Sequence, residues 1–175
     1  MQHLSKTELL ALLKAARDAR ERDWLMILVG FWHGLRASEV TTLTSDSVRD
    51  GFLTVQRLKG SLKTTQPLIV NQDPLLNEKD ALETRAREAQ PGERLFPVSR
   101  VQFFRVMRKH AATAGIPQHK AHPHVLKHSI AMQTIRGAGI ENVRAYLGHK
   151  SISSTGEYLK VDDDSASAAV ANALK

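Results

Sequence analysis

The sequence predicts a single α+β domain that is mainly helical and contains one small antiparallel sheet. Apolar residues recur at helical spacing over most of the chain, and alternation typical of strands is confined to residues 52–70. A length of 175 residues with 42% hydrophobic content suits one domain built around one core. We therefore expect residues 1–175 to fold as one unit.

The first helices are predicted from a capping motif and from apolar spacing. Ser5 and Glu8 form an S-x-x-E capping box ahead of regularly spaced leucines, which predicts a helix over about 6–17. Residues 21–32 are nearly all apolar after the first turn, as is typical of a helix buried on most sides. Gly34 ends this helix, and a short helix is expected directly after it.

The predicted sheet comes from one hairpin-rich stretch. Asp50-Gly51 is a dipeptide that favours a tight turn, and the alternating residues 52–58 read as the strand that follows it. Residues 59–61 predict the next turn, and residues 66–70 predict the returning strand. An antiparallel sheet of two or three strands should result.

The second half of the chain is predicted to be helical almost throughout. A charge-rich helix is expected within residues 75–90, and Ser99 is a suitable N-cap for a basic helix that ends at Gly115. Further helices are expected over about 124–137, 140–147 and 153–159, and in the alanine-rich end at 165–175.

Composition restricts the partners and the compartment. Lys and Arg number 25 against 18 Asp and Glu, a formal charge of +7 with a pI near 9.9, which favours a polyanion such as nucleic acid. A basic soluble protein with no such partner is the alternative. The absence of cysteine excludes disulfides and thiolate metal sites. No apolar run approaches the roughly 20 residues of a membrane span, and the N-terminus lacks a signal-peptide core, so a cytoplasmic protein is expected.

Residues that could carry chemistry gather between positions 122 and 158. His124 and Lys127 are three apart near a helix start, so they share one face and could address one anion together. His149 follows a glycine, and Tyr158 lies in a polar, serine-rich stretch. A phenol needs nearby cations and bases to act as a nucleophile, and these neighbours are of that kind.

Each of these residues also has an ordinary structural explanation. Tyr158 could be a packing residue, Arg36 a surface arginine, and Lys59 a solvated lysine at a hairpin tip. His124 and His128 have the spacing of the two histidines in the zinc motif H-E-x-x-H. No glutamate lies between them and the chain has no cysteine, so we expect no metal site.

Taken in order, these residues resemble the catalytic domain of the tyrosine recombinases, the phage integrase family. The resemblance covers nearly the whole chain and rests on five stretches, namely Gly34-Leu-Arg36-Ala-Ser-Glu39, the hairpin LKGSLKTTQPL, His124-Val-Leu-Lys127-His128, Leu147-Gly148-His149 and Thr155-Gly-Glu-Tyr158. The family pattern is an arginine and a supporting acid, a hairpin lysine, H-x-x-R, a histidine or tryptophan, and a tyrosine. It maps onto Arg36, Glu39, Lys59, His124, Lys127, His149 and Tyr158.

The resemblance implies that Tyr158 attacks a backbone phosphate of double-stranded DNA. The products would be a 3′-phosphotyrosine and a free 5′-hydroxyl, followed by rejoining to another strand. The bond energy stays in the covalent link, so no nucleotide cofactor and no metal are implied. Arg36 and Lys127 would hold the nonbridging oxygens and offset the developing charge.

The remaining roles follow from the same resemblance. Lys59 would protonate the leaving 5′ oxygen, and His124 would move the tyrosine proton. His149 would donate a hydrogen bond to the phosphate, and Glu39 would orient its neighbours.

Lys127 departs from the family pattern, which has a second arginine at this position. Arginine grips phosphate with two parallel N–H bonds, whereas lysine acts as a point charge. Loss of one transition-state contact can cost about 10²–10³ in rate. One alternative is therefore a DNA-binding relative with weakened catalysis. A second alternative is a type IB topoisomerase, because such enzymes share this chemistry.

The resemblance also implies an organisation. Family members usually carry an N-terminal core-binding domain that clamps the other face of the duplex, and we expect this chain to hold only the catalytic domain and to bind DNA weakly by itself. Self-association on DNA is expected, with the C-terminal helix docking on this or another copy through Ala166, Ala169, Val170 and Ala173. A nucleoid-associated protein of prokaryotic, archaeal or viral origin, from a mobile element or phage, would fit.

Overall fold

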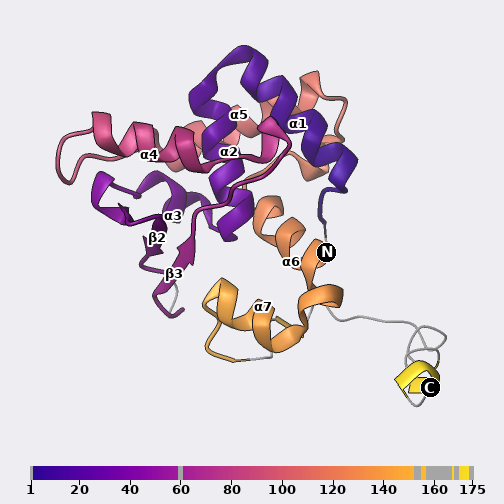
Figure 1. The fold of residues 1–175 in the computed structure, drawn as a ribbon. Coiled ribbons are helices and arrows are strands. Elements are labelled where there is room, and N and C mark those ends of the chain that lie inside the picture. The colour runs from indigo at the N-terminus through magenta and orange to yellow at the C-terminus, as the bar shows by residue number, and fades with distance from the viewer. Residues whose placement is uncertain (1, 59–60, 152–154, 157–166, 168–169, 174–175) are drawn as a thin grey trace.

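The protein is represented by a computed structural model that describes residues 2–58, 61–151, 155–156, 167 and 170–173. It is mainly helical with one small sheet, which confirms the predicted fold class (Figure 1). The longer helices are α1 (Lys6–Ala19), α2 (Glu21–His33), α4 (Lys79–Glu88), α5 (Arg100–Thr113), α6 (His124–Ala138) and α7 (Ile140–Leu147). The shorter ones are α3 (Ala37–Thr41) and the 3-10 turns η1 (Ser45–Ser47), η2 (Pro74–Leu76) and η3 (Gln118–Lys120).

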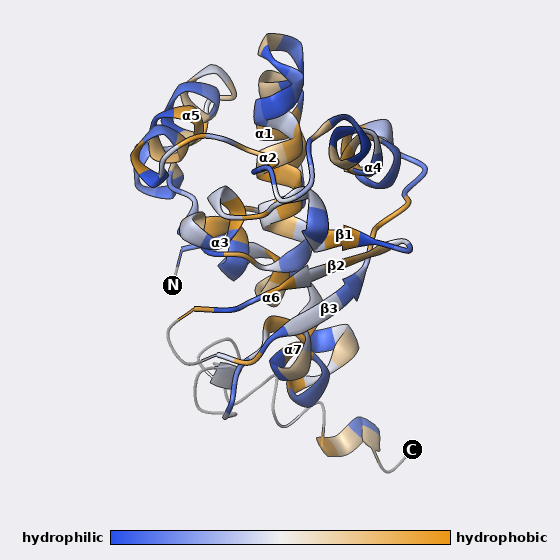
Figure 2. Ribbon diagram, turned by 90° about the vertical axis from the view of Figure 1, so that its left-hand side faces the viewer, coloured by the Kyte–Doolittle hydropathy of each residue, from blue (hydrophilic) through white to orange (hydrophobic). Residues whose placement is uncertain are grey.

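Helix α2 is the centre of the core. It packs against α1 and α6, and its residues from Asp23 to Phe31 are all buried, as its apolar sequence predicts. The predicted capping box of α1 is present, because Glu8 N donates to Ser5 Oγ at 3.1 Å and Ser5 N donates to Glu8 Oε1 at 3.0 Å. In Figure 2, hydrophilic and hydrophobic residues are mixed along α4 and α5, as expected for helices with one buried stripe.

The sheet has three antiparallel strands in the order β1 (Val48–Arg49), β2 (Phe52–Val55) and β3 (Thr64–Pro67). The turn at Asp50-Gly51 joins β1 to β2, and both residues have positive φ. This confirms the predicted turn and the small antiparallel sheet, for which two or three strands were expected. The strand predicted over residues 52–58 is shorter, because β2 ends at Val55. Of the next predicted turn, positions 59 and 60 lie outside the described residues.

The predicted bounds of the returning strand, residues 66–70, are wrong. Strand β3 begins two residues earlier and ends at Pro67. The apolar run after Pro67 leaves the sheet because Ile69 turns toward α4, where its carbonyl accepts from the N–H groups of Glu78 and Lys79. Val70 is 69% exposed, so apolar composition misplaced this strand.

The helices of the second half agree with the sequence, apart from one boundary. Ser99 caps α5, and α7 has the predicted bounds. The charge-rich helix α4 is shorter than expected, because Asp73 caps the separate turn η2 ahead of it. The helices predicted at 153–159 and 165–175 lie mostly outside the described residues.

Candidate active site

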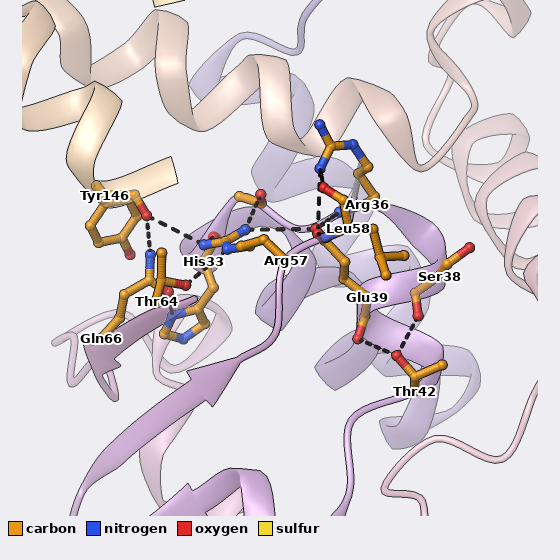
Figure 3. Close-up of polar contacts among 11 residues, drawn as sticks. His33, Arg36, Ser38, Glu39, Thr42, Arg57, Leu58, Thr64, Gln66 and Tyr146 are labelled. Atoms are coloured by element: carbon orange, nitrogen blue, oxygen red, sulfur yellow. Dashed lines mark hydrogen bonds and ion pairs between the residues drawn. The ribbon is translucent and has the colours of Figure 1, made fainter. Parts of the chain in front are cut away.

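Arg36 and Glu39 form the first half of the candidate site. Arg36 is the N-cap residue of α3, directly after the left-handed turn at Gly34 that ends α2. Glu39 is buried, and its Oε1 accepts from Arg36 N at 2.8 Å while its Oε2 lies 3.4 Å from Arg36 Nη1. Glu39 Oε2 also accepts from Leu58 N at 2.8 Å (Figure 3). Glu39 therefore ties Arg36 to the hairpin one residue before Lys59.

Arg57 is a buried arginine that the sequence analysis missed. Its guanidinium donates to Gly34 O, His33 O, Thr64 Oγ1 and Tyr146 O, at 2.8, 2.8, 2.8 and 3.3 Å, and Nη1 lies 3.7 Å from Glu39 Oε1 (Figure 3). Burial lowers the pKa of Arg57 and Glu39 opposes that shift, so the group stays charged. The signal was present in the alternation of the stretch, because Arg57 falls in phase with the buried Leu53 and Val55.

Lys127 lies in the first turn of α6 and is only 2% exposed. Its Nζ has no hydrogen-bond partner among the residues that the structure describes. Burial, together with the charge of Arg36 and against the opposing effect of Glu39, lowers the pKa of Lys127 to about 8. A buried ammonium without an acceptor is costly, so this group is suited to an anionic ligand.

His124 shares the first turn of α6 with Lys127. Its ring contacts that of His128 edge to face, with 4.2 Å between centroids. Partial burial, followed by nearby cationic groups, lowers the pKa of His124 to about 4. The imidazole is therefore neutral near pH 7 and able to accept a proton.

His149 is placed by the end of α7. Gly148 ends that helix in the left-handed conformation, and His149 Nδ1 lies 2.8 Å from Thr155 Oγ1. Burial, then the charges of Lys127 and Arg36, lower the pKa of His149 to about 4. If the Thr155 hydroxyl donates to Nδ1, the neutral ring carries its proton on Nε2 and can donate it to a ligand.

The hairpin and the end of α7 are held close together. Leu62 N donates to Gly148 O at 2.8 Å. A Cβ at Gly148 would lie 2.7 Å from Leu62 O and 3.0 Å from Arg57 Cγ, so only glycine fits there. The three stretches that carry Arg36, the hairpin and His149 thus meet, as the sequence predicted for their residues.

The open side of the site is a pocket with cationic walls. Arg36, Arg100 and His124 line it together with Phe104 and Leu58. It connects α3, α5 and α6, which lie far apart in the sequence. An anionic polymer could reach Arg36 and His124 from this side.

Lys59 and Tyr158 lie outside the described residues, so their places in the site remain predictions. For the zinc alternative, the part of the chain that the structure describes contains no group of three or more His, Cys, Asp or Glu side chains placed to hold a metal ion. None of the described helices is long and apolar enough to cross a membrane.

Known sequences resemble this chain over most of its length. The profile of the phage integrase family matches residues 2–165. The chain is 30% identical over 164 residues to the type 1 fimbriae regulatory protein FimB of Escherichia coli K12, covering 87% of this chain and 80% of FimB. It is 32% identical over 171 residues to the tyrosine recombinase XerA of Pyrococcus furiosus, covering 90% of this chain and 57% of XerA.

Solved structures show the same fold. A crystal structure of XerA recombinase aligns with a TM-score of 0.75 and 24% identity, over 98% of this chain and 63% of that one. The catalytic domain of bacteriophage HP1 integrase aligns with a TM-score of 0.68 and 24% identity, over 91% of this chain and 87% of that one. A lambda integrase dimer bound to a COC′ core site aligns with a TM-score of 0.73 and 20% identity, over 91% of this chain and 48% of that one.

Proposed function

This chain belongs to the phage integrase family, and on that premise we propose that it is the catalytic domain of a site-specific tyrosine recombinase that cleaves and rejoins double-stranded DNA. The observation that carries the proposal is the buried ammonium of Lys127, which has no hydrogen-bond partner among the described residues and is electrostatically coupled to Arg36. Glu39 is the carboxylate coupled to these cations and to Arg57, so the cluster keeps an excess of positive charge. A phosphodiester brings one negative charge, and more develops in the transition state.

In the proposed cleavage step, the phenol oxygen of Tyr158 bonds to phosphorus and the bond from phosphorus to the 5′ oxygen breaks. His124, neutral near pH 7, takes the phenol proton, and Lys59 gives a proton to the leaving 5′ oxygen. Arg36, Lys127 and His149 contact the nonbridging oxygens. The reverse sequence with a new 5′-hydroxyl rejoins the strands, so the cycle needs no cofactor.

Tyr158 is favoured as nucleophile because of the state of Tyr146. The chain has only these two tyrosines. The Tyr146 hydroxyl donates to Trp32 O, and burial raises its pKa above the ordinary value, so its phenolate is hard to form. This leaves Tyr158 as the phenol available to attack.

The test is a library of nicked suicide duplexes of random sequence, in which cleavage releases a short fragment and traps the protein on DNA. Wild type should give an SDS-stable adduct, and Tyr158→Phe should give none. Tyr146→Phe is the matched control and should keep the adduct. Sequencing of trapped DNA reports the target.

The second candidate is a DNA-binding relative that has lost catalysis, and the lysine at position 127 is the observation that favours it. Retention of duplex DNA by wild type without any adduct would support this candidate. Relaxation of supercoiled plasmid without a specific site would instead indicate topoisomerase activity.

We also propose that copies of this chain associate on DNA. The solved relatives include a lambda integrase tetramer bound to a Holliday junction. The described surface has an apolar groove between α2, α6 and α7, lined by Trp32, Ile69, Ile130, Val143 and Tyr146. The alanine-rich C-terminal segment of a second copy is the proposed occupant. Deletion of residues 165–175 should reduce assembly on DNA, and unchanged assembly would contradict this.

Two further expectations belong to the same proposal. Residues 1–175 by themselves should bind DNA weakly, and nanomolar affinity at physiological salt would contradict that. A DNA-acting domain of this kind should reside in the cytoplasm with the nucleoid, which fluorescence imaging of a tagged copy can check.

A further inference from the structure

The guanidinium of Arg57 joins the segments that carry the proposed catalytic residues, although it lies in none of the recognised motifs. We propose that Arg57 is a positioning residue for strand cleavage, which sets the place of His149 relative to Arg36 through a buried clamp. The inference rests on the proposed function and adds a residue to that site. With a fully buried side chain, Arg57 can act only through other residues.

Arg57 contacts the C-terminal ends of two helices. It donates to the carbonyl oxygens of His33 and Gly34 at the end of α2, and to the carbonyl oxygen of Tyr146 near the end of α7. The C-terminal ends of helices carry partial negative charge, which a fixed guanidinium offsets. Because its donors are held in one rigid plane, a single side chain fixes the distance between the two helix ends.

The clamp has a second member on the same carbonyl. Gln66 Nε2 donates to Tyr146 O at 2.6 Å, which turns the amide oxygen of Gln66 toward His33 Nδ1 at 2.8 Å. The other ring nitrogen of His33 lies 2.7 Å from Glu78 Oε2. Both ring nitrogens of His33 therefore lie within hydrogen-bond distance of side-chain oxygen atoms. The buried ring braces the backbone that Arg57 binds.

The aliphatic part of Arg57 completes the link to His149. Its Cγ would lie only 3.0 Å from a Cβ at Gly148, the residue directly before His149. On the other side, Nη1 faces Glu39, which holds the backbone N–H of Arg36. The side chain of Arg57 therefore lies next to both Gly148 and Glu39.

The replacement Arg57→Lys keeps the charge but cannot span these acceptors at once. A misplacement of about 1 Å can cost on the order of 10²-fold in rate, so we expect cleavage to slow by roughly 10- to 100-fold. Affinity for DNA should change by less than about twofold, because the side chain is buried away from any DNA. Thr64→Val, which removes only the acceptor of Arg57 Nε, is a milder variant that should slow cleavage several-fold.

The experiment is single-turnover cleavage of a trapped suicide duplex by the full chain, combined with His149→Ala in a double-mutant cycle. If Arg57 acts through His149, Arg57→Lys and Thr64→Val slow the wild type but have little further effect in His149→Ala. Arg85→Lys is the control, since Arg85 also donates to a carbonyl, that of Leu95, at a distance from the site. It should leave cleavage unchanged.

The outcomes separate the two proposals. Absence of an adduct from wild type overturns the proposed function and this inference with it. An active wild type in which the effects of Arg57→Lys and His149→Ala multiply overturns the positioning role alone. Loss of DNA affinity in Arg57→Lys equal to its loss of cleavage does the same, as does a slowing by Arg85→Lys that matches its effect.

Discussion

The two buried cations of the site, Arg57 and Lys127, are held in opposite ways. Arg57 has an acceptor for its donors on three segments and an ion pair with Glu39. Lys127 is equally buried, but its ammonium meets no acceptor among the described residues. The first arrangement stabilises the fold, and the second is costly until an anion arrives. The difference indicates that Arg57 supports the fold and that Lys127 is placed to bind an anionic ligand.

Removing the carboxylate that pairs with Arg57 should have the largest effect on stability. Glu39→Gln leaves Arg36 and Arg57 without their carboxylate, and breaking such a buried pair typically costs about 3–5 kcal/mol. Urea unfolding measures this loss. Asp18→Asn, which removes the carboxylate of the exposed pair with Lys14, should change stability little. Equal effects of the two substitutions would contradict the scaffold role of Glu39.

Removing the charge of Lys127 should slow cleavage without destabilising the fold. Lys127→Met has similar length without charge, and we expect cleavage to fall by about 10²–10³ with no loss of stability. Lys120→Met is the matched control, because Lys120 is paired with Glu8 at 2.9 Å. It should weaken folding slightly and leave cleavage unchanged. A stability loss in Lys127→Met larger than in the control would place Lys127 with the scaffold.

The rate of cleavage should depend on pH through the ionisation of Lys127. In the proposed mechanism, cleavage needs the charged form of Lys127. Burial lowers the pKa of this group to about 8, so the rate should fall as pH rises through about 8. In Lys127→Arg this alkaline fall should disappear and cleavage should be preserved or raised, because arginine stays charged. His124 and His149 titrate near pH 4 and should leave the rate flat around pH 7. A fall at the same pH in Lys127→Arg would assign it to another group.

Stability should change in the opposite direction over that range. The folded-state pKa of Lys127 lies below its ordinary 10.5, so the unfolded chain holds the proton to higher pH. The free energy of unfolding therefore gains a contribution as pH rises from about 8 toward 10.5. Urea unfolding of wild type against Lys127→Met isolates it, and identical pH profiles would contradict the lowered pKa.

The smallest expected effect concerns the orientation of His149. Thr155→Val removes one hydrogen bond to Nδ1, worth about 0.5–1.5 kcal/mol, so cleavage should slow roughly two- to tenfold. Thr113→Val, which removes a hydroxyl bonded to the Lys109 carbonyl, should have no effect on cleavage. Equal rates for wild type and Thr155→Val would show that Thr155 does not fix the tautomer.

Local signals in the sequence predicted most of the fold. Capping at Ser5 and Ser99 and apolar spacing located the helices within a few residues. The end of β3 was misplaced because the Ile69 carbonyl accepts hydrogen bonds from backbone N–H groups at the start of α4, a contact that no local pattern reveals. Tertiary contacts decide such boundaries.

The site divides along similar lines. The candidate residues in short motifs were predicted from the order of those motifs, and they are Arg36, Glu39, His124, Lys127 and His149. Arg57 had only its buried phase in the strand as a signal, since its partners Gly34 and Tyr146 are 23 and 89 residues away. Likewise, the lack of an acceptor for Lys127 within the described part of the chain is a property of the packed site. Both features became visible only when these segments were brought together.

Peptide mapping of the trapped DNA adduct is the direct test of Tyr158 as nucleophile and of Lys127 as its phosphate-binding partner. We predict a single modified peptide, carrying a 3′-linked phosphate on Tyr158, from wild type and from Lys127→Arg, and a much lower yield from Lys127→Met. An adduct on Tyr146 or on another residue, or full yield from Lys127→Met, would contradict it.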